Sequence, residues 1–170
     1  MKRCWSVALL AAVIGCRASS EKPAAHNAVP DSAFAALQAR GAQVMGVDQY
    51  TSSHVFEPLA DGGRIVLQRD VADSIGVATI RAHMQDIAAR FADGDFTLPG
   101  LVHDQTVPGT RVMAERRDRI RFVVDTLPHG GQVRIVTRDP VALAAVHEFL
   151  AFQRHDHRAP AHEHEAADEP

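Results

Sequence analysis

Two stretches of this chain follow the same pattern, and this internal repeat constrains the fold more than any other feature. The first copy spans residues 54–91 and the second spans residues 120–155. Each copy has two apolar, β-rich runs joined through a Gly-Gly pair, at positions 62–63 and 130–131. Glycine adopts the positive φ angles that tight hairpin turns need, so we expect each pair to lie in a hairpin turn.

A stretch with helical periodicity follows each hairpin, at residues 72–91 and at residues 141–155. Their apolar stripes consist of Val77, Ile80, Met84, Ile87 and Phe91 in the first and of Leu143, Val146 and Leu150 in the second. Such a stripe is typical of a helix that packs on a sheet. We therefore predict an α+β fold: a duplicated ββα unit, with an antiparallel sheet and two helices packed on one of its faces.

The repeat belongs to a predicted single domain at residues 31–158. We expect a short helix from residue 31 or 32 to Arg40, stopped by Gly41, and then a strand at residues 44–47. The segment between the copies, residues 93–110, has three glycines, two prolines and no periodicity. A connection of this length is usually functional or mobile, so we expect a long loop there.

The N-terminus resembles a bacterial lipoprotein signal. Lys2 and Arg3 precede an apolar run at residues 7–14, which is too short to span a bilayer, and Val13-Ile14-Gly15-Cys16 resembles a lipobox. We expect residues 1–15 to be a signal peptide, Cys16 to be diacylated and residues 16–30 to be a flexible tether. The predicted location is the cell envelope, facing the periplasm and held by lipid. Arg17 in place of an aspartate favours the outer membrane in a Gram-negative cell.

Composition excludes several classes of function. The net charge is -3 and there is no dense run of lysine and arginine, so we expect no nucleic acid partner. Cys4 leaves with the predicted signal, so Cys16 alone remains. A disulfide framework, thiol catalysis and a cysteine-rich zinc site are therefore excluded. Because no catalytic motif is recognisable, we do not expect an enzyme.

Ten histidines are the unusual feature of the composition. Four of them are candidate metal ligands: His54 at a core-facing position of the first hairpin, His83 and His147 at the edges of the two apolar stripes, and His103 on the long loop. Zinc, copper and nickel all accept neutral imidazole nitrogens. The alternative is that each is a hydrogen-bonded histidine at the edge of a core. The predicted disordered tail, residues 159–170, is rich in histidine and acidic residues and is either a weak metal-capture site or a solubilising segment.

These features leave three functional hypotheses. The first is a non-enzymatic, lipid-anchored envelope protein that binds a transition-metal ion through the four histidines. The second is a structural or partner-binding envelope lipoprotein, in which the open face of the sheet or the long loop contacts another envelope protein. The third is a small hydrolase with a metal-bound water at the same histidines.

Four segments resemble a family of uncharacterised secreted bacterial proteins that are sometimes labelled aspartate carbamoyltransferase. The matching residues are Met45-Gly46-Val47-Asp48-Gln49, Thr51-x-x-His54-x-Phe56, Gly94-Asp95-Phe96-x-x-Pro99-x-x-Val102-His103 and Val146-His147-x-Phe149-Leu150-x-Phe152-Gln153. The resemblance covers most of residues 44–158, supports the domain boundaries and draws attention to His54, His103 and His147. The transcarbamoylase label does not fit, because that enzyme needs a Ser-Thr-Arg-Thr-Arg-type phosphate loop and two α/β domains.

Overall fold

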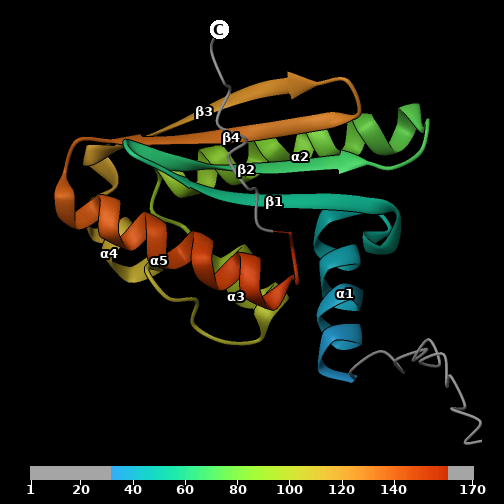
Figure 1. The fold of residues 1–170 in the computed structure, drawn as a ribbon, viewed down its shortest axis with the longest axis horizontal. Helices are drawn as coiled ribbons and strands as arrows, with labels where there is room; N and C mark the ends of the chain where they lie inside the picture. Colours follow the sequence, from blue (N-terminus) through green and yellow to red (C-terminus); the bar gives the residue numbers. More distant parts are fainter. Residues whose placement is uncertain (1–31, 161–170) are drawn as a thin grey trace, which may run out of the picture.

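The computed structural model describes residues 32–160, and in this part of the chain helices pack on a four-stranded sheet (Figure 1). The expected signal peptide, Cys16 and the tether lie outside the described residues, as does most of the expected tail. None of the helices within residues 32–160 is long and apolar enough to cross a membrane.

The sheet consists of two antiparallel hairpins joined side by side. Strands β1 (Ser52–Leu59) and β2 (Gly62–Arg69) form the first, and β3 (Ile120–Leu127) and β4 (Gly130–Thr137) form the second. The strand order is β1-β2-β4-β3, and β2 pairs with β4 in antiparallel register. The predicted α+β class with an antiparallel sheet is therefore confirmed, whereas the duplication of a ββα unit stays a prediction.

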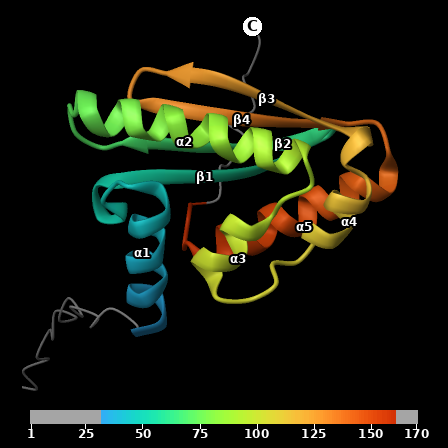
Figure 2. The same cartoon turned by 180° about the vertical axis from the view of Figure 1, so that it is seen from behind.

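Two long helices cover one face of the sheet, as expected, but each lies mainly on the hairpin of the other half. Helix α2 (Ser74–Ala92) follows the first hairpin and packs on β3 and β4. Helix α5 (Pro140–Asp156) follows the second hairpin and packs on β1 and β2. Figures 1 and 2 show the two helices on the same side of the sheet. The two halves of the chain are thus interlocked.

Aspartate caps set the start of both long helices. The Asp73 side chain accepts a hydrogen bond from the backbone N–H of Gly76, the third residue of α2. The Asp139 side chain accepts from the first free N–H groups of α5, those of Val141 and Ala142. Each cap satisfies backbone donors that have no partner inside a helix.

The first helix is longer than expected. Helix α1 (Ser32–Met45) continues through Gly41 and is followed by Gly46, whose φ of +72° is the left-handed conformation that closes many helices. The expected strand at residues 44–47 is therefore wrong. A Cβ at Gly41 would lie 3.3 Å from the Oε1 of Gln49 in the 3-10 turn η1 (Gln49–Thr51), so a larger residue there would require the Gln49 side chain to shift by a few tenths of an ångström.

The segment expected to be a long loop, residues 93–110, contains one short helix, and a second short helix begins at its last residue. Helix α3 (Thr97–His103) ends at Asp104, which has a φ of +55°, and α4 (Thr110–Glu115) begins after Gly109, which has a φ of +79°. A short 3-10 turn, η2 (Arg117–Arg119), then enters β3. Helix α3 packs on α1, and α4 packs on α5. Helices this short bury too few residues to leave a clear periodicity.

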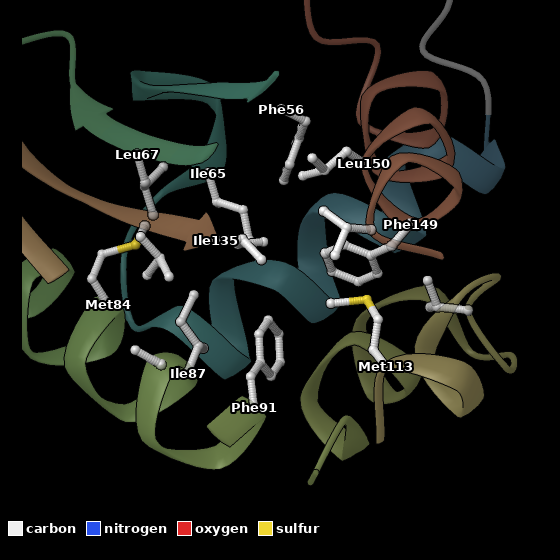
Figure 3. Close-up of a cluster of buried hydrophobic side chains, with 14 of the residues drawn as sticks. Phe56, Ile65, Leu67, Met84, Ile87, Phe91, Met113, Ile135, Phe149 and Leu150 are labelled. Carbon is white, nitrogen blue, oxygen red and sulfur yellow. The ribbon is translucent and has the colours of Figure 1, made fainter. Parts of the chain in front are cut away.

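A single apolar core lies between the sheet and the helices (Figure 3). Phe91 of α2 meets Phe149 of α5 edge to face, with ring centroids 5.9 Å apart. Leu67 of β2 and Ile135 of β4 are fully buried beneath these helices, and Met113 closes the core from α4. The core therefore joins both hairpins and both long helices.

Candidate functional site: a histidine-lined cavity

A cavity of about 70 Å³ lies at the end of this core, and four histidines from different parts of the fold line it. They are His54 of β1, His83 of α2, His103 of α3 and His157, which directly follows α5. Apolar side chains form most of the remaining wall, among them Met45, Phe56, Leu67, Met84, Val102 and Phe149. Three of the four predicted ligands thus line one cavity.

His54 and His157 form the centre of this arrangement. Their rings are stacked, with centroids 4.9 Å apart and planes 23° from parallel, and Phe56 flanks both. The Nε2 atom of His54 and the Nδ1 atom of His157 are buried and have no hydrogen-bond partner within residues 32–160. Most buried polar atoms in proteins are hydrogen-bonded, so two such atoms at one cavity require an explanation.

The surroundings keep these imidazoles neutral. Burial lowers the pKa of His54 to about 4, with a smaller contribution from the nearby His83. Burial also lowers the pKa of His157 to about 2, helped by His54 and His103. The pKa of His83 is lowered by burial, against an opposing effect from Asp86. Each ring is therefore neutral at pH 7 and carries one nitrogen with a free lone pair.

His103 has a different role, because both of its ring nitrogens are engaged. Its Nδ1–H donates to the carboxylate of Asp156, and its Nε2 lies 2.9 Å from the Oε1 of Gln153. Its ring also stands edge-on to His157, with centroids 5.1 Å apart. His103 therefore fixes the end of α3 to the end of α5 and holds the wall of the cavity next to His157.

His147 lies outside this cavity, contrary to the expectation that it joins the other three. It belongs to α5, and its Nε2–H donates to the carbonyls of Leu59 and Gly62, at 2.9 and 3.0 Å. The residue that acts like His147 in the other half is Arg81, which donates from α2 to the carbonyls of Leu127 and Gly130.

His157 lines the cavity, but the sequence analysis did not select it as a candidate ligand. The spacing of His157 from earlier residues of α5 could have identified it. Phe149, Gln153 and His157 follow one another at intervals of four residues and all line the cavity. This spacing keeps side chains on one face of a helix, so the face of α5 continues one residue past its end.

The described residues do not contain a preassembled metal site of the usual kind. Within residues 32–160, no group of three or more histidine, cysteine, aspartate or glutamate side chains is arranged to hold a metal ion. At the cavity, the nitrogen atoms that have no hydrogen-bond partner and could act as metal ligands are the buried Nε2 of His54 and Nδ1 of His157. Comparisons with protein-family models, with curated proteins and with solved structures found no match for this chain.

Proposed function

We propose that this protein is a lipid-anchored bacterial envelope protein that binds a transition-metal ion in the histidine-lined cavity. The observation that carries the proposal is the pair of buried, unpartnered imidazole nitrogens, one on His54 and one on His157. A neutral imidazole with a free lone pair is the form in which histidine binds metals. A bound ion would satisfy both nitrogens at once, and His83 supplies a third imidazole at the same cavity.

The role that we propose is binding, sensing or buffering of the ion rather than catalysis. The cavity wall is mostly apolar, and the nitrogens of His103 are already engaged by Asp156 and Gln153. That histidine therefore has no free nitrogen with which to accept a proton from a substrate. The proposed lipid anchor at Cys16 and the family resemblance agree with an envelope location, where metal ions enter the cell.

Thermal unfolding of the full chain tests this proposal. Four side chains outside the cavity that could also bind metal, two thiols and two tail imidazoles, should first be replaced. The substitutions are Cys4→Ser, Cys16→Ser, His162→Gln and His164→Gln, which leave residues 32–160 unchanged. In this background, at least one of Zn²⁺, Cu²⁺, Ni²⁺ or Cu⁺ should raise Tm over that in EDTA. Saturation at about 100 times Kd adds about 2.7 kcal/mol, or several degrees.

Matched variants make the result specific to the cavity. His54→Gln and His157→Gln should each abolish the rise in Tm, whereas His155→Gln, on the exposed side of the same α5, should keep it. No rise with any of the four ions, or a rise that survives both cavity variants, would refute metal binding here. The partner-binding lipoprotein, with the uncovered face of the sheet as its contact surface, would then replace it.

A further inference from the structure

We propose that the cavity selects the soft monovalent ion Cu⁺, held by the thioether of Met84 together with the imidazoles of His54 and His157. This inference rests on the proposed function and specifies the ion and a further ligand. Imidazole suits zinc, copper and nickel alike, so the histidines alone do not choose among them. The choice comes from the other donors at the cavity and from its charge.

Methionine sulfur is the second kind of donor at the cavity. Met84 of α2 and Met45 at the end of α1 both line it, and both are buried. Figure 3 shows the Met84 side chain extending from α2 toward Leu67 of β2. Leu67 is the cross-strand partner of His54, so both side chains lie on the same face of the sheet. The sulfur is therefore on the side of the sheet where His54 enters the cavity.

Thioether sulfur distinguishes between the candidate ions. Methionine is a soft ligand that favours Cu⁺, whereas carboxylate and water oxygens favour harder ions. Zinc in a structural site takes four nitrogen, sulfur or oxygen ligands in a tetrahedron, and its sulfur ligands are thiolates. Among the residues that the structure describes, no aspartate or glutamate lines this cavity, and both cysteines of the chain lie outside the described part. The donor set thus matches Cu⁺ better than Zn²⁺.

The charge of the ion leads to the same choice. Burying an ion in apolar surroundings is costly unless an opposite charge compensates it, and the cost rises with the square of the ionic charge. His54 and His157 are neutral, and no carboxylate of residues 32–160 lines the cavity. The charge of a divalent ion would stay uncompensated there, whereas the free-energy cost of burying a monovalent ion is much smaller. The cavity therefore disfavours Zn²⁺ and Ni²⁺.

The geometry requires some adjustment of side chains when the ion binds. Metal–nitrogen bonds are about 2 Å long, and His54 and His157 are stacked with their ring centroids 4.9 Å apart. One ring must therefore turn toward the ion. Methionine has three rotatable bonds and fits irregular spaces, so Met84 can follow that movement. This explains how the cavity can bind an ion although its donors are not preassembled.

Competition titrations in the background without Cys4, Cys16, His162 and His164 test the inference. Cu⁺ is supplied anaerobically with ascorbate, Ag⁺ is added in chloride-free buffer as an air-stable substitute, and Zn²⁺ is titrated in parallel. We expect Cu⁺ to bind at least about 100-fold more tightly than Zn²⁺. Met84→Leu should weaken Cu⁺ and Ag⁺ binding by about tenfold or more and leave Zn²⁺ binding unchanged.

Met113→Leu is the matched control. Met113 is as deeply buried as Met84 but does not line the cavity, so its replacement should change none of the affinities. Methionine and leucine have similar volumes, so both variants should fold, which Tm without metal verifies. X-ray absorption of the copper-loaded protein adds a direct measurement. With the cysteines replaced, only methionine can supply a sulfur neighbour, and Met84→Leu should remove it while Met113→Leu keeps it.

The possible failures are distinguishable. Equal affinity for Zn²⁺ and Cu⁺, or copper with only nitrogen neighbours in the parent chain, would overturn the selection of Cu⁺ and leave metal binding in place. Unchanged Cu⁺ binding in Met84→Leu would overturn the role of that thioether. Absence of binding by all the ions would overturn the proposed function itself.

Discussion

At the scale of single residues, the two Gly-Gly pairs have a different role from the expected one. The hairpin turns are at residues 60–61 and 128–129, and the glycines lie in β2 and β4. A Cβ at Gly62 would lie 2.0 Å from the Ile135 carbonyl oxygen, and one at Gly130 would lie 2.0 Å from that of Leu67. Glycine is therefore required where the two central strands approach each other. The sequence pattern located both hairpins, but not this reason.

The second glycine of each pair, Gly63 or Gly131, allows a helix to pack closely on the sheet. A Cβ at Gly63 would lie 2.1 Å from Leu150 of α5, and one at Gly131 would lie 3.2 Å from Met84 of α2. The close contact of each helix with the sheet thus depends on a missing side chain. The spacing of the repeat indicates that these positions are equivalent, but only the three-dimensional structure identifies the side chain that occupies the space.

The buried histidines predict how stability depends on pH. The pKa of His54 is about 4 in the folded state, and its ordinary value is 6.5. As pH falls below 6.5, His54 binds a proton in the unfolded state but not in the folded state, so this residue lowers the free energy of unfolding progressively until about pH 4 and has no such effect above pH 7. The loss from His54 is roughly 3 kcal/mol at most.

Urea denaturation at pH 7 and pH 4.5 measures this loss. His54→Phe should make the pH dependence less steep, because phenylalanine cannot titrate and suits the neighbouring Phe56, while His83 and His157 still contribute to it. His155→Gln, which replaces an exposed histidine, should leave the dependence unchanged. Equal slopes for the parent chain and His54→Phe would show that His54 is not held neutral by burial.

At the scale of elements, the structure connects each long helix to the end of a hairpin. His147 ties α5 to the β1–β2 turn, and Arg81 ties α2 to the β3–β4 turn. Periodicity predicted both helices to within two residues at each end. It did not predict which hairpin each helix covers, because an apolar stripe specifies a buried face and not the surface against which that face packs.

Removal of the His147 contact should destabilise the fold without affecting the cavity. We expect His147→Ala to lower the free energy of unfolding by about 1–3 kcal/mol, because two partly buried carbonyl groups lose their donor. Urea denaturation at pH 7 measures this change. In the proposed copper titration, the same variant should bind Cu⁺ as the parent chain does. Loss of Cu⁺ binding without loss of stability would instead place His147 in the metal site.

At the scale of the whole molecule, the interlocked halves should fold as one unit. Helix α2 packs on the second hairpin and α5 on the first, so neither half buries its own apolar surface alone. We expect chains of residues 32–95 and 110–160 to be unfolded separately, as judged by far-UV circular dichroism. The whole chain should unfold in one transition, with the same midpoint by circular dichroism and by tyrosine fluorescence from Tyr50. A folded isolated half would contradict the interlocked core.

The sequence by itself determined the elements of this protein: two hairpins, two long helices and an α+β class, because periodicity and turn residues are local properties of the chain. It also singled out His54, His83 and His103. Only the tertiary structure decided that these three meet His157 at one cavity and that His147 does not. Such a meeting depends on how helices cross onto distant strands, and this is set by close packing at positions such as Gly63 and Gly131.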